Sequence, residues 1–157
     1  MEKEKKRRTP LEELTRYLAP RMRTVAEARK RLEEKLYEES EIEAAIQRFL
    51  ELGYLDDSEY VRAYCEYAFG KGRGRSRIRQ ELRDKGVPSE VIDNGIEDYV
   101  YENRIDEWEI AREIAERTLQ GVPRPLEQRN LAKVARKLEQ RGFASSTIIR
   151  ILGEIKE

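Results

Sequence analysis

The sequence predicts an all-α protein of three tandem three-helix repeats that form an elongated, curved body. Three observations predict it. Apolar residues recur at helical spacing throughout, a helix-turn-helix segment occurs three times, and charged residues make up 41% of the 157 residues. Because a globular protein usually carries roughly 25% charged residues, this chain can bury only thin cores. We therefore expect small modules stacked along the chain.

The first expected repeat covers residues 10–54 and follows a basic tail at residues 1–9. Its second helix starts at Thr24, because Thr24 and Glu27 have the spacing of a capping box. Its third helix ends at Gly53. The apolar positions of the three helices are Leu11, Leu14 and Leu18; Val25, Ala28, Leu32 and Leu36; and Ile42, Ala45, Ile46, Phe49 and Leu50.

The second expected repeat covers residues 55–101. Asp56 and Asp57 offer N-caps for its first helix, which a run of glycines ends. A short second helix stops at Gly86, and Pro88 suits the first turn of the third. The apolar positions are Tyr60, Val61, Tyr64, Cys65 and Ala68; Ile78 and Leu82; and Val91, Ile92, Ile96 and Tyr99.

The third expected repeat covers residues 102–157. Its first helix ends near Gly121, where Pro123 and Pro125 mark a loop, and its second helix is closed by Gly142. The apolar positions are Trp108, Ala111, Ile114, Ala115 and Leu119; Leu131, Val134, Ala135 and Leu138; and Ile148, Ile151, Leu152 and Ile155.

The repeat is visible when the chain is aligned with itself. RLEEKLYEESEIEAAIQRF, ELRDKGVPSEVIDNGIEDY and KLEQRGFASSTIIRILGEI align without gaps, which places Leu32 with Leu82 and Leu138. Leu36 stands where the other repeats have Gly86 and Gly142. We therefore expect the first repeat to build this turn differently or to end its helix elsewhere.

Several function classes are disfavoured by what the sequence lacks. It has no histidine, and its one cysteine, Cys65, has no histidine to activate it. No apolar run of about 18 residues could span a membrane, and the basic N-terminus lacks the apolar core of a signal peptide. We expect a cytoplasmic monomer that is not an enzyme and uses no cofactor or metal.

Positive charge is concentrated in one stretch of this formally neutral chain. Residues 71–85 carry 7 basic and 2 acidic side chains, whereas residues 86–110 carry 1 basic and 8 acidic ones. Within GKGRGRSRIRQELRDK, Arg75, Arg79 and Arg83 are four apart and form a ridge with no acidic partner at i+4, whereas Arg77 can pair with Glu81. The ridge is expected to need an external anion, such as a phosphate or an acidic protein surface.

Two interpretations of this stretch are open. The glycines before the helix could turn backbone N–H groups toward a ligand, next to the positive end of the helix. Alternatively, the run is a solvated face that packs against an acidic block of the same molecule, such as residues 90–98 or 33–43.

The segment LGYLDDSEYVRAYCEYAFGKGRGRSRIRQELRDKGVPSEVI resembles the RecX family of bacterial regulatory proteins, and YLAPRMRTVAEARKRLEEK resembles that family's opening. The resemblance implies tandem three-helix repeats that lie in the groove of the RecA filament on single-stranded DNA. It also implies inhibition of the ATPase, strand exchange and coprotease activities of RecA. The contact set it implies is Lys71, Arg73, Arg75, Arg79, Arg83 and, with less support, Lys85.

Two other functions stay open on the residues alone. One is a module that binds DNA or RNA directly, although the acidic blocks would repel a phosphate backbone and keep such binding weak. The other is a helical adaptor for a different protein. Tyr60, Tyr64 and Tyr67 are expected to be partly core, with base stacking as the alternative.

Overall fold

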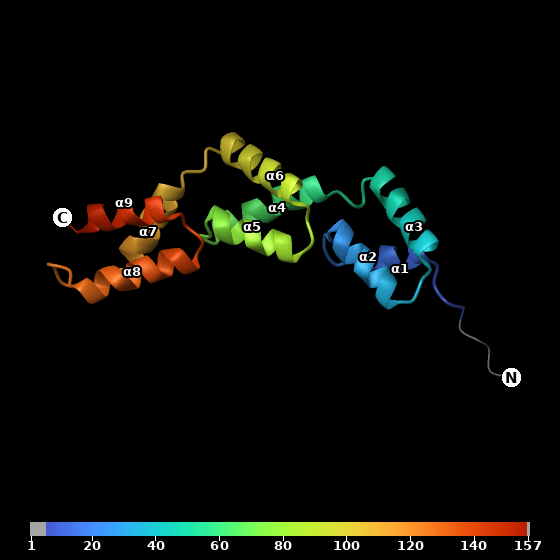
Figure 1. The fold of residues 1–157 in the computed structure, drawn as a ribbon, viewed down its shortest axis with the longest axis horizontal. Coiled ribbons are helices and arrows are strands. Elements are labelled where there is room, and N and C mark those ends of the chain that lie inside the picture. Colours follow the sequence, from blue (N-terminus) through green and yellow to red (C-terminus); the bar gives the residue numbers. More distant parts are fainter. Residues whose placement is uncertain (1–5, 157) are drawn as a thin grey trace.

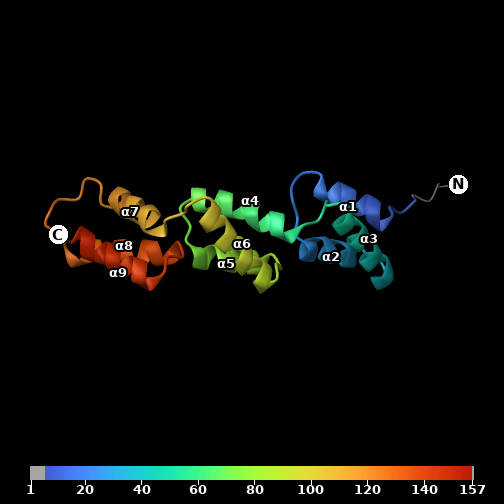
Figure 2. The same ribbon diagram turned by 90° about the horizontal axis from the view of Figure 1, so that it is seen from above.

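The computed structural model describes residues 6–156, and that part of the chain contains nine α-helices and no strand. Residues 1–5 of the expected basic tail lie outside the described residues. The helices are α1 (Pro10–Leu18), α2 (Val25–Glu34), α3 (Glu39–Glu51), α4 (Asp57–Gly70), α5 (Arg75–Asp84), α6 (Ser89–Glu102), α7 (Glu107–Thr118), α8 (Gln128–Gln140) and α9 (Ser145–Ile155). They follow one another in three groups along one long axis, which confirms the predicted elongated all-α body (Figure 1 and Figure 2).

Each group of three helices encloses its own small hydrophobic core. The largest fully buried side chains include Leu14, Leu32 and Leu55 in the first group, Val61, Ile78, Leu82, Ile92 and Ile96 in the second, and Val134, Leu138 and Ile151 in the third. Ile110 packs against both the second and the third core. The predicted apolar stripes therefore form three thin cores, as the high charge content led us to expect, except that Leu11, Leu36 and Leu50 are exposed.

The predicted helix starts follow local hydrogen bonding, with one exception. The Thr24–Glu27 capping box is present, with the Glu27 N–H 3.1 Å from Thr24 Oγ1 and the Thr24 N–H 3.0 Å from Glu27 Oε1. Asp56 is the N-cap of α4. Asp57 is instead the first residue of α4, and its carboxylate accepts a hydrogen bond from the Val25 N–H at 3.0 Å. Asp57 therefore caps α2 across the boundary between repeats, and its prediction as a cap of its own helix is wrong.

The turn between the second and third helices has the same geometry in all three repeats. Leu36 has a φ of 63°, in the left-handed region that Gly86 (83°) and Gly142 (90°) also occupy. The residue after each of them donates to the carbonyl of the matching leucine, Leu32 in the first repeat, at 3.1–3.3 Å. The expectation of a different first turn is wrong, because these backbone hydrogen bonds dictate the turn even where a leucine must take the strained conformation.

Leu36→Gly is expected to raise the free energy of unfolding by about 1 kcal/mol, the cost of holding a non-glycine residue in this region. The leucine side chain is 82% exposed, so its removal forfeits little burial. Urea unfolding followed by circular dichroism measures the change. Leu36→Ala is the matched control, because it removes the same side chain and keeps the strain. An equal gain from the alanine variant would contradict the backbone explanation.

The repeats are joined end to end through their second helices. The turn after α8 meets the start of α5, where the Gly74 N–H donates to the Arg141 carbonyl at 2.7 Å. The turn after α5 meets the start of α2, where Thr24 Oγ1 donates to the Lys85 carbonyl at 2.7 Å. Helices α8, α5 and α2 thus form a head-to-tail row, with the negative end of each helix dipole facing the positive end of the next. We refer to these three helices as the second-helix row.

A carboxylate completes each joint at an equivalent position. Asp57 accepts from the first amide of α2, and Glu107 Oε1 accepts from the first amide of α5, that of Arg75, at 2.7 Å. Asp57 and Glu107 are the first residues of α4 and α7. Burial raises the pKa of Asp57, and the hydrogen bond from Val25 opposes this effect. The same joint therefore occurs twice and sets the spacing of the repeats.

The described end of the basic tail is packed against the first repeat. The Tyr37 hydroxyl donates to the Arg8 carbonyl at 2.5 Å, and the Arg7 guanidinium lies 4.1 Å from the centre of the Tyr37 ring. Arg7 also donates to the Lys35 carbonyl. That carbonyl corresponds to those of Lys85 and Arg141, so the tail occupies the place that a neighbouring repeat takes at the two joints.

Candidate partner-binding surface

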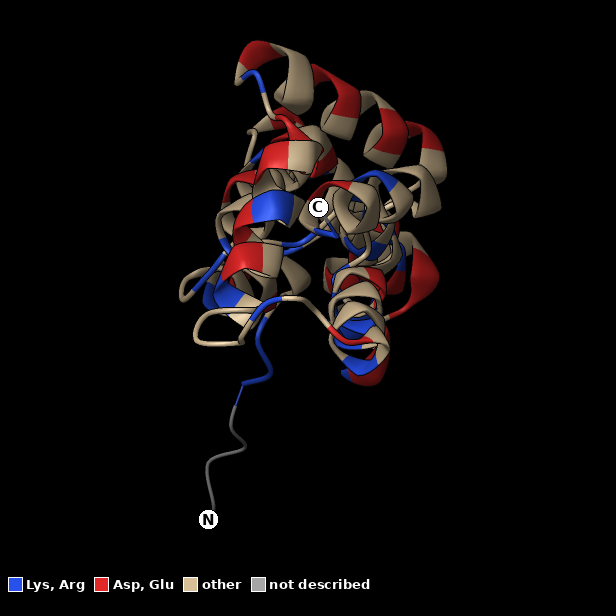
Figure 3. Ribbon diagram, turned by 90° about the vertical axis from the view of Figure 1, so that its left-hand side faces the viewer, with Lys and Arg blue, Asp and Glu red and all other residues tan. Residues whose placement is uncertain are grey.

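Charge is sorted between the second and third helices of the repeats. Helices α5 and α8 each carry four basic side chains, with two acidic ones in α5 and one in α8. Helix α3 carries four acidic residues and one basic residue, and α6 carries five acidic residues and no basic one. In the end-on view of Figure 3, acidic bands line the helix at the top of the molecule. A partner would therefore meet net positive charge on α5 and α8 and net negative charge on α3 and α6, whereas α2 and α9 are balanced.

Two of the predicted contact residues, Arg73 and Lys85, face a groove lined by tyrosines. Arg73 Nη1 lies 3.1 Å from Glu81 Oε2, and its guanidinium lies 5.3 Å from the centre of the Tyr67 ring. The Lys85 ammonium lies 5.9 Å from the centre of the Tyr64 ring. The groove, of about 640 Å³, runs between α4 and the first repeat. Arg73 is held by an internal carboxylate, so of these two cations Lys85 is the one free to meet a partner.

Two tyrosines of this groove, Tyr60 and Tyr64, belong to the core of the second repeat as predicted, whereas Tyr67 does not. Tyr60 is 8% exposed and Tyr67 is 51% exposed. The Tyr64 hydroxyl donates to Glu81 Oε2 at 2.8 Å. Burial, followed by the hydrogen bond to Glu81, raises the pKa of Tyr64 above its ordinary value. Tyr67 is therefore the ring of the three that offers most of its surface to a partner.

The expected ridge on α5 is largely neutralised within the molecule. Arg79 Nε lies 2.9 Å from Asp93 Oδ1 on α6, and Arg75 Nε lies 3.7 Å from Glu107 Oε2 on α7. The expectation that the ridge needs an external anion is wrong for Arg75 and Arg79, because their carboxylate partners lie on neighbouring helices. The predicted pair of Arg77 with Glu81 is present at 3.4 Å. Asp93 belongs to the acidic block 90–98, so part of the stretch packs as the alternative interpretation proposed.

The start of α5 is occupied by the third repeat. The amides of Gly74, Arg75 and Ser76 donate to the carbonyl of Arg141, the carboxylate of Glu107 and the carbonyl of Gly142, at 2.7, 2.7 and 3.2 Å. The prediction that the glycine-rich segment turns free N–H groups toward a ligand is therefore wrong. The segment forms the joint between repeats.

Lys71 and Arg83 complete the predicted set and lie apart from each other. The Lys71 ammonium lies 6.0 Å from the centre of the Tyr67 ring, and its carbonyl accepts from Arg141 Nη1 at 3.0 Å. Arg83 is exposed and, within residues 6–156, has no carboxylate oxygen within 4.0 Å. The six residues are thus divided between the tyrosine groove, the outer face of α5 and the joint with the third repeat. Arg83 has the most accessible charge on α5.

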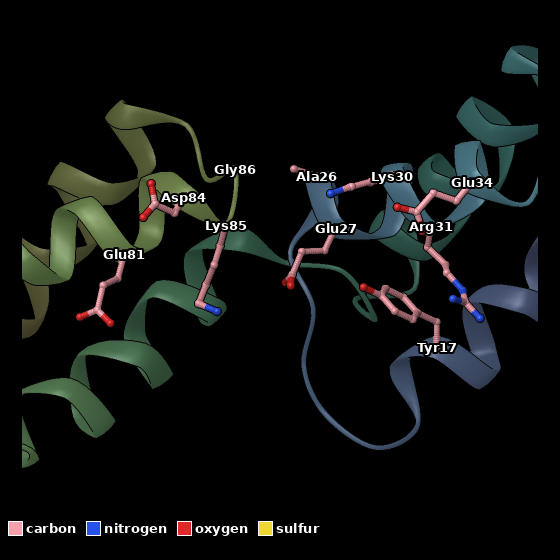
Figure 4. Close-up of a pocket in the computed structure, with 10 residues that line it drawn as sticks. All are labelled: Tyr17, Ala26, Glu27, Lys30, Arg31, Glu34, Glu81, Asp84, Lys85 and Gly86. Atoms are coloured by element: carbon pink, nitrogen blue, oxygen red, sulfur yellow. The ribbon is translucent and has the colours of Figure 1, made fainter.

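The cleft at the first joint contains charges of both signs and no recognisable reaction centre. It has a volume of about 590 Å³ and lies between α2 and the end of α5 (Figure 4). Glu27 and Tyr17 enter it from the first repeat, and Lys85 and Glu81 from the second (Figure 4). In the described part of the chain no group of three potential metal-ligating side chains is gathered together.

Cys65 is buried, and burial raises the pKa of its thiol to about 11, so it stays protonated near neutral pH. Across residues 6–156, no helix combines the length and the apolar character that crossing a bilayer requires.

A second group of cations lies on α8, which the sequence interpretation did not single out. Lys133, Arg136 and Lys137 project from this helix, and residues 6–156 provide no carboxylate oxygen within 4.0 Å of any of them. The spacing of 3 and 4 residues places them on one side of a helix, which is a signal that could have identified them.

Comparison with known proteins identifies the family. The model of the first RecX three-helix domain matches residues 15–49, and that of the second matches residues 56–96. The regulatory protein RecX of Trichlorobacter lovleyi is 34% identical over 107 residues, which cover 68% of both chains. The chain belongs to the RecX family. The regulatory proteins RecX of Vibrio campbellii and Vibrio parahaemolyticus are each 38% identical to it, and the matches span 54% and 59% of their lengths.

Solved RecX structures share the fold. The crystal structure of RecX from Lactobacillus salivarius has a TM-score of 0.81 over 93% of this chain and 94% of that one, at 20% identity. A second crystal structure, of a regulatory protein RecX, has a TM-score of 0.74 and 26% identity, over 90% of this chain and 69% of that chain. These structures confirm the predicted tandem helical repeats.

Proposed function

We propose that this RecX protein binds the RecA filament on single-stranded DNA and inhibits its ATPase, strand exchange and coprotease activities. Membership of the RecX family is the observation that carries the proposal. The shape supports it, because three repeats joined through one row of helices make a long body that could follow a filament groove. The separation of basic and acidic helices supports it as well, because complementary charge aligns a long partner in a single register.

The proposed contacts are the six cations Lys71, Arg73, Arg75, Arg79, Arg83 and Lys85. They differ in how firmly carboxylates of the same molecule bind them. Arg73 and Arg75 are bound to Glu81 and Glu107, so their loss would disturb the protein itself. Arg79 has a 38% exposed side chain and pairs with an exposed aspartate, a pair that a partner could exchange at small cost. Arg83 and Lys85 have no carboxylate within 4.0 Å in the described chain. Arg79, Arg83 and Lys85 are therefore the best test set.

The experiment is a titration of the single-stranded-DNA-dependent ATPase of RecA with this protein. The wild type is expected to inhibit it, and the Arg79→Ala/Arg83→Ala/Lys85→Ala variant to require roughly tenfold more protein, because each lost charged contact costs a fraction of a kcal/mol to about 1 kcal/mol. The matched control is Arg48→Ala/Arg62→Ala/Arg112→Ala. It removes three positive charges from exposed pairs within single helices.

The outcomes separate the function from the site. Inhibition by the wild type and the control, but not by the folded α5 variant, supports both. Equal inhibition by all three proteins keeps the function and rejects these contacts. The absence of any effect of the wild type on RecA from the same source would reject the function.

A further inference from the structure

We propose that the face of α8 formed by Lys133, Arg136 and Lys137 binds the phosphate backbone of a single DNA strand. The argument starts from the difference between the two most basic helices of the row. Four arginines, Arg73, Arg75, Arg77 and Arg79, lie in or next to α5 and each has a carboxylate within 4.0 Å. The three cations of α8 have none in the described part of the chain. Helix α8 therefore offers three such cations within five residues, whereas α5 and the residue after it offer only Arg83 and Lys85.

The arrangement of these cations suits one strand. Lys133, Lys137 and Arg141 are four residues apart, so they rise along one side of the helix at about 6 Å per step. Arg136 lies beside them on the same side. A single row of this kind can follow one backbone.

The row leads into a pocket between α7, α8 and the segment that joins α4 to α5. The pocket has a volume of about 380 Å³, and its lining includes Lys71, Gly72, Arg117, Lys137 and Arg141. Its one carboxylate, that of Glu113, lies 3.8 Å from Arg117. Arg141 is positioned by its hydrogen bond to the Lys71 carbonyl, and a Cβ on Gly72 would lie 3.0 Å from its Nη1. The pocket has room for a phosphate group but is too small for a duplex.

The surroundings favour a nucleic acid over an acidic protein. Protein interfaces have an apolar centre, yet none of the exposed large hydrophobic side chains of the described chain lies between residues 102 and 148. Binding to a phosphate backbone needs only cations and the release of counterions. No exposed large hydrophobic side chain of the described chain lies on α8 itself, although Ile149 of the adjacent α9 is exposed, so the face of α8 favours a backbone.

The experiment measures the binding of a labelled oligothymidylate, without RecA, over a range of salt concentrations. The Lys133→Ala/Arg136→Ala/Lys137→Ala variant is expected to bind at least roughly tenfold more weakly at low salt. The slope of log affinity against log salt is expected to fall by about 2, because each neutralised phosphate of a single strand contributes about 0.7. Thermal unfolding by circular dichroism verifies that the variant is folded.

The control variant Arg48→Ala/Arg62→Ala/Arg112→Ala changes the net charge equally and is expected to bind like the wild type. Equal losses in both variants, or no loss in the α8 variant, would overturn the proposal. Tighter binding of polyglutamate than of the oligonucleotide, with the same sensitivity to the α8 variant, would overturn the choice of DNA. Because RecA is absent from this assay, its result stands apart from the test of RecA inhibition.

Discussion

Gly142→Ala is expected to lower the free energy of unfolding by about 3 kcal/mol, because it affects both the turn and the joint. Gly142 has a φ of 90°, which costs an alanine about 1 kcal/mol. A Cβ there would also lie 2.4 Å from the backbone nitrogen of Arg77 and 2.9 Å from its Cα. These atoms belong to α5 and cannot yield without separating the second and third repeats, an overpacking cost of about 1–3 kcal/mol. Chemical denaturation with urea measures the loss.

Gly53→Ala is the matched control for this substitution. Gly53 has a similar φ of 77°, but a Cβ there would meet nothing within 4 Å. This variant is expected to lose only the backbone term, about 1 kcal/mol. Equal losses at the two positions would mean that the close contact between the repeats contributes nothing to stability.

The helices and the cores could be predicted from the sequence because both depend on near neighbours in the chain. A capping box such as Thr24–Glu27 spans four residues, and an apolar stripe repeats within one or two turns. The turn at Leu36 is the exception, because residue type alone does not predict its geometry. A leucine there suggests a different turn, whereas the backbone hydrogen bonds hold it in the geometry that glycine takes in the other repeats.

The site could be predicted only in part, because its electrostatics depend on distant residues. The i, i+4 spacing predicts the Arg77–Glu81 pair. It does not predict the partners Asp93 and Glu107, which are 14 residues from Arg79 and 32 residues from Arg75. An excess of arginines in the sequence therefore overstates the available charge, because the fold pairs most of them with carboxylates.

The joints between the repeats can be recognised in the sequence. Asp57 and Glu107 are separated by the same 50 residues as Thr24 and Gly74, the two N-caps that they support. Extending the self-alignment to the first helices would have matched these acids. The same offset places Gly74 with Thr24, which marks the end of the glycine-rich segment as the start of a helix.

Glu81→Ala is expected to lower the free energy of unfolding by about 2 kcal/mol. The Glu81 carboxylate accepts from the Tyr64 hydroxyl at 2.8 Å and from Arg73 at 3.1 Å, and it lies 3.4 Å from Arg77 Nε. The side chain of Arg73 is only 18% exposed, so the loss of the Glu81 carboxylate leaves the largely buried charge of Arg73 without its partner. Glu116→Ala, which breaks an exposed pair with Arg112, is the control and is expected to cost a few tenths of a kcal/mol.

The ionisation of Tyr64 provides a second measurement of the same carboxylate. Because the hydrogen bond to Glu81 helps to raise the pKa of Tyr64, Glu81→Ala is expected to move that pKa down toward its ordinary value, as followed by tyrosinate absorbance. A raised folded-state pKa of a phenol also makes stability fall as the pH rises past about 10, where the unfolded tyrosine ionises. That fall is expected to be smaller in the variant. A variant with wild-type stability and an unchanged Tyr64 titration would show that Glu81 does not hold the groove together.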